Sequence, residues 1–179
     1  MQSPNRGGVR PHTYGVVLHS TRGGASSYDA EYRAKLNHFA SRASQVSAHA
    51  VVGPNGEADF PVADDLEAWH AEEHNKTHLG IELVQPKPGD PIPEPTLRRA
   101  AQIVKGWQAK YGFPLQWSTE SGLAEHREMP QGKRVGKSDV GPPFDQGAFL
   151  RMVGGSSSTD PAPALLLVGA VALLLILDL

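Results

Sequence analysis

Residues 14–20 read YGVVLHS, a short apolar run with two adjacent valines and a histidine near its end. Runs of this length and composition, bounded by turn residues, are typical of buried strands. A stretch rich in glycine and serine follows at residues 21–26, so the strand is predicted to end at Ser20. His19 and Ser20 would then lie at its carboxyl end, where ligands gather in α/β sheets.

Two more apolar runs, at residues 46–52 (VSAHAVV) and 79–84 (LGIELV), predict further strands. The sequence GPNG at residues 53–56 is a turn signal, and a short run at residues 59–62 follows it. Residues 46–62 are therefore predicted to form a hairpin.

Apolar residues at helical spacing predict two long helices. The first is expected over about residues 27–41, where Ser26 and Asp29 fit a capping box. The second has the clearer pattern, over residues 97–111, and Gly112 is suited to its carboxyl cap. Strands and helices together favour an α/β fold.

Three long segments are predicted to be loops. Residues 64–77 are polar, and residues 85–95 hold five prolines, which lack the donor that a sheet interior needs. Residues 126–139, HREMPQGKRVGKSD, contain a proline and two glycines. A loop of this kind is expected to fold back and bring His126 close to Asp139.

The composition of the chain limits its possible functions and the residues that could bind a metal. The chain has 179 residues, a formal net charge of -2 and no cysteine. The charge argues against a nucleic-acid-binding protein. Without cysteine there can be no disulfide, thiolate zinc site or cysteine nucleophile, so any metal must be held by histidine and carboxylate.

The chain divides by composition into four parts. Residues 1–13 are predicted to be a flexible lead-in, and residues 14–153 a folded domain that ends in a short helix within residues 144–153. Residues 154–163, GGSSSTDPAP, are predicted to be a linker, and residues 164–179 form an apolar tail.

Two interpretations of the tail stand side by side: it packs on the domain, or it associates with a membrane as a hydrophobic helix. A helix over residues 164–179 would be about 24 Å long. That is short for a hydrocarbon core of about 30 Å, although it could still anchor the chain. The first residues contain no apolar segment of the kind that marks a secretory signal.

Glu82 lies inside the apolar run at residues 79–84. A carboxylate that faces a core is costly unless it is paired or used in chemistry. Alternation in a strand leaves a second interpretation equally open, in which Glu82 faces solvent on the open side of the sheet.

Six segments, in order, carry a resemblance to a known family: VVLHST, SAHAVVGPNGEADF, AWHAEEHN, LGIELV, EHRE and KSDVGPPFD. Over about residues 14–152 the sequence resembles the zinc N-acetylmuramoyl-L-alanine amidases. That group includes phage lysozyme-type amidases, bacterial anhydro-muropeptide amidases and peptidoglycan recognition proteins. The resemblance implies a mixed central sheet of about five strands flanked by helices, with zinc at the rim of a groove.

The resemblance also implies the site. His19, His126 and Asp139 match the zinc ligands, a set that leaves a fourth position open as in catalytic zinc sites. Glu82 matches the family's catalytic glutamate, which would move protons of the attacking water, and Lys137 matches a lysine that would stabilise the oxyanion.

Three more positions are implied with supporting roles. His70 and Asn75 match residues that line the substrate groove. His49 would pack against the residues of the site and help to hold them in place. The sequence departs from the family at Ala48, where some phage-type relatives carry a catalytic tyrosine, and at Glu72, where glycine is usual. The segment between His126 and Asp139 is also longer than in the short phage forms.

The expected function is hydrolysis of the amide between N-acetylmuramic acid and L-alanine in peptidoglycan, by a monomer with Zn²⁺. An endolysin of a phage or prophage, made in the bacterial host cytoplasm and acting on the wall, is the first expectation. The alternatives are a bacterial wall-remodelling or muropeptide-recycling amidase and a non-catalytic peptidoglycan-binding module.

Overall fold

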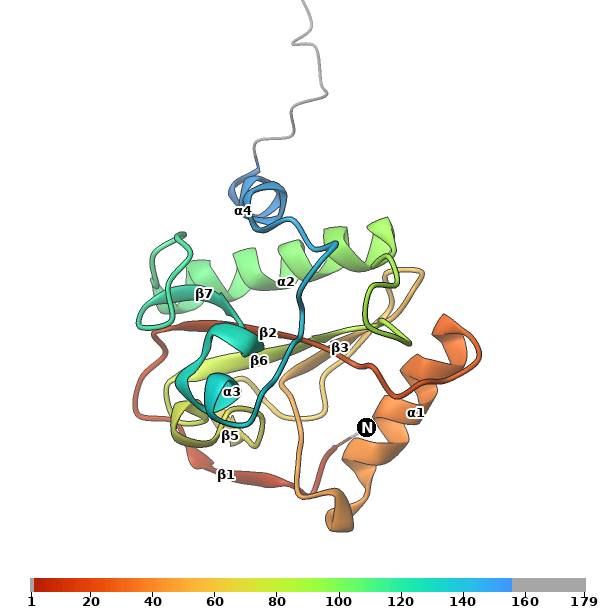
Figure 1. Cartoon of the computed structure of the whole chain (residues 1–179). Coiled ribbons are helices and arrows are strands. Elements are labelled where there is room, and N and C mark those ends of the chain that lie inside the picture. The colour runs from red at the N-terminus through yellow and green to blue at the C-terminus, as the bar shows by residue number, and fades with distance from the viewer. Residues whose placement is uncertain (1, 156–179) are drawn as a thin grey trace, which may run out of the picture.

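Strand β2 (Gly15–Ser20) lies inside a five-stranded sheet in the computed structural model, which describes residues 2–155 (Figure 1). It is parallel to both of its neighbours, β6 (His78–Leu83) and β7 (Gly122–Glu125). Beyond β6, β3 (Ala50–Val52) is also parallel, and β4 (Ala58–Asp59) closes that edge in the antiparallel sense. The predicted mixed sheet of about five strands is confirmed, and so is the hairpin of β3 and β4.

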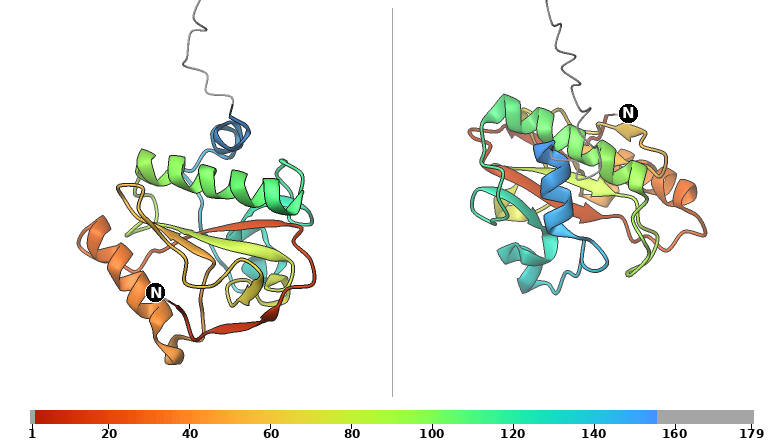
Figure 2. Two further views of the ribbon diagram at one scale, coloured as in Figure 1. Left: turned by 180° about the vertical axis from the view of Figure 1, so that it is seen from behind. Right: turned by 90° about the horizontal axis from the view of Figure 1, so that it is seen from above.

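One face of this sheet is covered by helix α2 (Glu94–Tyr111), and α4 (Gln146–Gly154) packs on the outer side of α2 (Figures 1 and 2). Each fully buried aliphatic side chain in this layer contributes about 1.5–3 kcal/mol by leaving water. Gly112 ends α2 with φ +73°, as the predicted cap requires. The largest apolar core lies here and includes Val16, Leu18, Leu79, Ile81, Leu83, Ala100, Val104, Trp107 and Phe149.

Helix α1 (Tyr28–Ala40) covers part of the opposite face, where its Tyr32 and Phe39 pack with Val51. Its position agrees with the predicted helix. Its cap differs, because the side chain of Ser27 and not Ser26 accepts the hydrogen bond from the Ala30 N–H, at 3.2 Å. A short 3₁₀ turn, η1 (Arg42–Ser44), follows the helix.

The first residues are ordered, which corrects the predicted flexible lead-in. Strand β1 (Arg6–Val9) pairs antiparallel with β5 (Leu66–Ala68), a strand inside the segment 64–77 that was predicted to be a loop. Asn5 is fully buried, and its amide donates to the backbone carbonyls of Ser41 and Val46. Hydrogen bonds rather than apolar burial hold this segment, and a hydrophobic pattern does not report them.

The segment 126–139 is also more regular than predicted. It contains the 3₁₀ turn η3 (His126–Glu128) and the helix α3 (Pro130–Arg134), in which Pro130 occupies the first turn. A side chain at Gly132 would place its Cβ 1.8 Å from the His126 carbonyl oxygen, so this glycine permits close backbone packing rather than breaking a helix. The remaining element is the 3₁₀ turn η2 (Glu72–His74).

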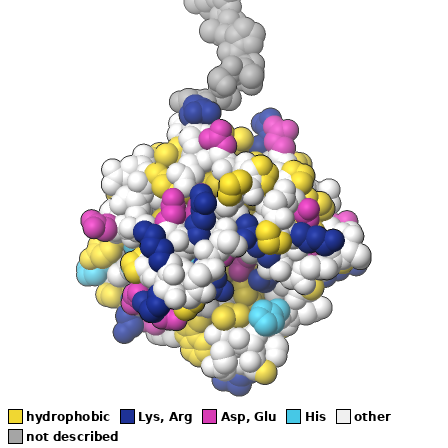
Figure 3. All heavy atoms as spheres, viewed as in Figure 1, with side chains coloured by type: hydrophobic (Ala, Val, Ile, Leu, Met, Phe, Trp, Pro, Cys, Tyr) yellow, Lys and Arg dark blue, Asp and Glu magenta, His cyan; other side chains and the backbone are white. Residues whose placement is uncertain are grey.

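No helix within residues 2–155 is both long and apolar enough to cross a bilayer. The predicted tail at residues 164–179 and most of the predicted linker lie outside the described residues. On the face shown in Figure 3, basic and acidic side chains are interspersed over the surface.

Candidate metal centre

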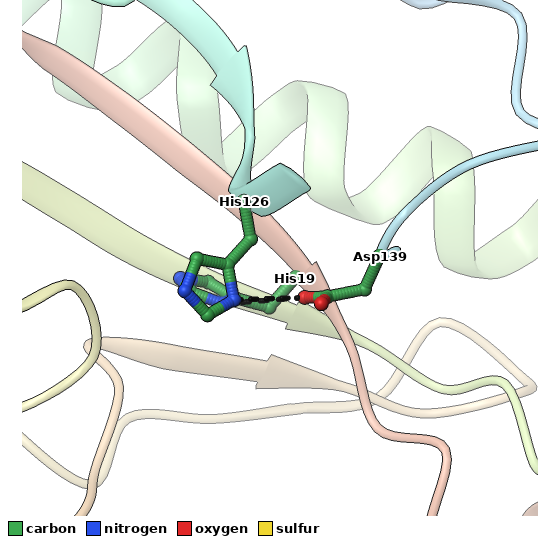
Figure 4. Close-up of side chains that lie close together, drawn as sticks. All are labelled: His19, His126 and Asp139. Atoms are coloured by element: carbon green, nitrogen blue, oxygen red, sulfur yellow. Dashed lines mark hydrogen bonds and ion pairs between the residues drawn. The ribbon is translucent and has the colours of Figure 1, made fainter. Parts of the chain in front are cut away.

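Three polar side chains meet at the carboxyl edge of the sheet. His19 lies near the end of β2, and His126 directly follows β7, so two parallel neighbours deliver both rings to one edge. Asp139 reaches the same point from the loop after α3 (Figure 4). The Nδ1 atoms of His19 and His126 are 3.0 Å apart. Oδ2 of Asp139 lies 3.5 Å from Nδ1 of His19 and 3.1 Å from Nδ1 of His126.

The spacing of these three atoms fits a zinc ion. Zinc–ligand bonds of about 2.0–2.2 Å in a tetrahedron put the ligand atoms about 3.3–3.6 Å apart, close to the three separations measured here. All three side chains are buried, and two imidazoles with one carboxylate form the donor set of catalytic zinc sites. Three ligands leave the fourth position of a tetrahedron for water or substrate.

The charge states suit metal binding. Burial lowers the pKa of His19, and the neighbouring His126 lowers it further, so the neutral ring with a free lone pair is favoured. Burial alone would raise the pKa of Asp139, but its close contacts with His126 and His19 outweigh burial and hold that pKa below its ordinary value. Neutral histidine and ionised carboxylate are the forms that ligate metals.

Arg22 holds the loop that carries Asp139, a role that the sequence did not reveal. Its guanidinium donates to Ser138 Oγ at 2.6 Å and to the Val140 carbonyl, and its Nε donates to Gln85 Oε1 at 3.0 Å. The two residues that flank Asp139 are therefore fixed to the end of β2.

Glu125 fixes the same loop from the β7 side. It is fully buried, and its carboxylate accepts from the Gly141 N–H at 2.5 Å and from Gln146 Nε2 at 2.8 Å. Arg127 pairs with this carboxylate at 2.7 Å and offsets the cost of burying it. The only hint in the sequence is the position of Glu125 directly before His126.

Glu82 lies beside the cluster because β6 places it in register with His19 of β2. It is 8% exposed, so the interpretation that it faces open solvent is wrong. Oε1 lies 3.5 Å from Nζ of Lys35, which comes from α1. Oε2 is buried and has no hydrogen-bond partner within the described residues. A buried carboxylate oxygen without a partner is costly, and a catalytic role is one of the established explanations for such a group.

A cleft of about 450 Å³ opens over these groups and is bounded by β2, α1 and the loop before Asp139. Lys137 is exposed and lies on the wall of this cleft, two residues before Asp139. The residues that line it include His19, Arg22, Lys35, His38, Trp69, His70, Glu82, His126, Lys137 and Asp139. The structure thus brings the predicted metal-binding and catalytic residues to a single cavity.

The three residues predicted to support the site lie in different places. His70 lines the cleft, and its Nδ1 is 3.1 Å from Nε2 of His19. Asn75 lines an adjoining cavity, and its Oδ1 accepts from the backbone N–H groups of His70 and Ala71.

His49 lies deeper and contacts none of the three candidate ligands. Its Nε2 donates to the Leu66 carbonyl at 2.9 Å, and its Nδ1 accepts from the Gly80 N–H at 2.8 Å. Burial lowers the pKa of His49 to about 3. Its ring meets that of His70 edge-on, with centroids 5.7 Å apart, so its support for the site passes through His70.

Residues 10–142 match the sequence pattern of the N-acetylmuramoyl-L-alanine amidase family. No curated protein sequence matches the chain. Among solved structures, a selenomethionine derivative of AmpD superposes with a TM-score of 0.68 at 20% identity, covering 86% of this chain and 92% of that one.

Two further structures share the fold at lower identity. The endolysin amidase LysCS from Clostridium intestinale has a TM-score of 0.62 at 12% identity, covering 86% of this chain and 91% of that one. The Staphylococcus aureus hydrolase AmiA, solved with its ligand, has a TM-score of 0.60 at 15% identity, covering 81% and 73%.

Proposed function

The chain belongs to the N-acetylmuramoyl-L-alanine amidase family and is a peptidoglycan amidase, and we propose that His19, His126 and Asp139 hold the zinc for this hydrolysis. The bond cleaved is the amide between N-acetylmuramic acid and L-alanine. The observation that carries the proposal is the buried, unpartnered Oε2 of Glu82 beside a three-ligand cluster in one cleft.

Each side chain has a distinct role in this proposal. When bound, zinc supplies Lewis acidity, which polarises the amide carbonyl and lowers the pKa of water toward about 7. Glu82 accepts a proton from the attacking water as the new C–O bond forms. It then delivers that proton to the nitrogen as the C–N bond breaks, so the amine leaves neutral. Lys137 reaches in from the wall of the cleft and stabilises the negative charge on the carbonyl oxygen.

Mass spectrometry of digested peptidoglycan, with and without zinc, tests the bond and the metal together. The expected products are free stem peptides that begin with L-alanine, formed by the zinc-loaded protein and lost after chelation. Restoring zinc should restore them. Unchanged product formation in a chelator would contradict the metal role, and a different cleaved bond would contradict the substrate.

We further propose that the protein acts as an endolysin on the intact wall. The apolar sequence of residues 164–179 supports this role, because a membrane-associated tail would hold the domain next to its wall substrate. Turnover on intact sacculi should exceed turnover on soluble anhydro-muropeptides. The reverse preference would instead indicate a muropeptide-recycling amidase.

The tail is tested separately by fractionating cells that express the full chain or a version without residues 154–179. The full chain should partition with membranes and the truncated chain should not. Identical distributions would contradict membrane association while leaving the amidase activity untouched.

A further inference from the structure

The outer nitrogens of the two candidate histidine ligands, those that face away from the cluster, both have partners. His126 Nε2 lies 2.7 Å from Oε1 of the buried Gln131, which accepts its hydrogen. The lone pair of the neutral ring is then on Nδ1, the atom that faces Asp139. The tautomer of His126 is therefore set by an ordinary amide.

His19 has a less usual partner, because its outer nitrogen meets a third histidine. Nε2 of His19 lies 3.1 Å from Nδ1 of His70, and the two rings meet at 88°. Imidazole can donate or accept, so this contact alone does not fix which ring carries the hydrogen.

The far side of His70 resolves the direction. Its Nε2 lies 3.1 Å from the carbonyl oxygen of His78, which can only accept. His70 therefore carries its hydrogen on Nε2 and presents a lone pair on Nδ1. His19 must then donate from Nε2, and its own lone pair lies on Nδ1, the atom 3.0 Å from His126 Nδ1. One carbonyl thus determines the tautomers of two rings in series.

The fold holds His70 in place on three sides. Its backbone N–H donates to Asn75 Oδ1 at 2.9 Å, and its ring packs edge-on against His49. On the sheet side lies Gly80 of β6, where a Cβ would sit 2.6 Å from Cγ of His70. Only a residue without a side chain at position 80 leaves room for this ring.

We infer that His70 is a positioning residue that locks His19 in the Nε2-protonated tautomer, so that Nδ1 faces the metal. The inference rests on the proposed zinc-dependent function and adds to it a residue that acts through His19. A partner on the outer nitrogen raises the basicity of a ligating imidazole and fixes its ring, and its loss typically weakens metal binding by about 10- to 100-fold.

The test compares His70→Phe with His70→Asn in the full-length protein. Phenylalanine keeps a ring but removes the acceptor, whereas asparagine places Oδ1 near the former Nδ1. Zinc affinity, measured by competition with a chromophoric chelator and without substrate, should fall about 10- to 100-fold in His70→Phe. His70→Asn should recover most of it, and His12→Phe, an exposed histidine outside the site, should match the parent protein.

The tautomer itself is read from histidine side-chain NMR with ¹⁵N labelling. His19 should carry its hydrogen on Nε2 in the parent protein and in His70→Asn, and should show both tautomers in His70→Phe without metal. If His70→Phe fails to fold, Gly80→Ala displaces the ring while keeping the residue, and it should weaken zinc binding in the same direction.

The outcomes separate the two proposals. Equal zinc affinity in His70→Phe, or in Gly80→Ala if that variant replaces it, together with an unchanged His19 tautomer, overturns the role of His70 and leaves the amidase mechanism intact. A parent protein that binds no zinc at all overturns the proposed metal centre, and the role of His70 with it.

Discussion

The two faces of the central sheet are built from alternate residues of the same strands, yet beside the cleft one face carries polar side chains where the other carries apolar ones. Along β6, Leu79, Ile81 and Leu83 enter the apolar core beneath α2, while the intervening positions are His78, Gly80 and Glu82. Along β2, Val16 and Leu18 enter the same core, and His19 lies on the other side. Successive strand residues point to opposite faces, so one strand can supply both a core and a site.

The cavities on the two sides of the sheet differ in the same way, one apolar and the other polar. A cavity of about 230 Å³ beside α2 and α4 is lined by apolar residues with Asp145 as its only charged side chain. The cleft on the other side, about 450 Å³, has many ionisable groups in its lining, and they come from separate segments of the chain. On the α2 face, stability depends on how much apolar area is buried and how completely the core volume is filled. On the cleft face, each buried polar group needs a specific hydrogen-bond partner. A polar group that is buried without one lowers stability, and a role in the reaction can explain why it is present.

Replacing Glu82 with Gln tests the cleft face most strongly. We expect a loss of about 100- to 10,000-fold in kcat, because the amide cannot take a proton from water. Zinc content should be unchanged, and the variant should remain folded. Glu94→Gln, which alters an exposed glutamate paired with Arg98 on α2, is the matched control and should keep full activity. Full activity in Glu82→Gln would remove the proposed base.

Replacing Ile81 with Ala, one residue earlier on the same strand, tests the opposite face. The free energy of unfolding in urea should fall by about 2–5 kcal/mol, because a fully buried side chain leaves a cavity. Activity per folded molecule should remain. Val9→Ala, at a position that is 72% exposed, should cost under about 0.5 kcal/mol. A specific loss of activity in Ile81→Ala would show that the two faces are coupled.

Acid should destabilise the protein through the histidines of the cleft face. Burial lowers the pKa of His78 to about 4, below its ordinary value of 6.5. The unfolded chain therefore binds a proton between pH 6.5 and 4 that the folded chain does not, so stability is present above pH 6.5 and falls as pH falls through this window. From pH 7 to pH 5 this histidine alone should account for about 2 kcal/mol.

Urea unfolding of His78→Gln at pH 7 and at pH 5 measures how much of the loss of stability is caused by His78. The variant should lose about 2 kcal/mol less on acidification than the parent protein. His12→Gln, at an exposed position, is the control. Equal pH sensitivity in His78→Gln and the parent protein would show that other groups cause the acid loss.

The smallest expected effect concerns α1, which brings Lys35 to Glu82. Ser27→Ala removes the cap of this helix and should lower the free energy of unfolding by about 1 kcal/mol. Ser26→Ala, at the neighbouring serine, should cost less, since only Ser27 accepts from the Ala30 N–H among the described residues. A larger cost at Ser26 would place the cap where the sequence pattern predicted it.

Much of the fold could be predicted, and the exceptions share a cause. The strands with His19 and Glu82 and the helix over residues 97–111 follow from apolar runs and helical spacing, which are local. The β1–β5 pair was missed because hydrogen bonds to Asn5 hold it, not an apolar pattern. The helix α3 was missed because Pro130 and Gly132 resemble breakers, although one starts the helix and the other permits close packing.

The sequence by itself determined the strands that carry His19 and Glu82, and which chemistry a cysteine-free chain can offer a metal. Through family resemblance it also indicated which side chains are candidates for the site. Only the tertiary structure decided how those side chains meet. The register of β2 with β6 sets Glu82 beside His19, Arg22 and Glu125 fix the Asp139 loop, and the His78 carbonyl orients two imidazoles in series. Strand propensity is a property of neighbouring residues, whereas a tautomer depends on an atom brought close from another part of the chain.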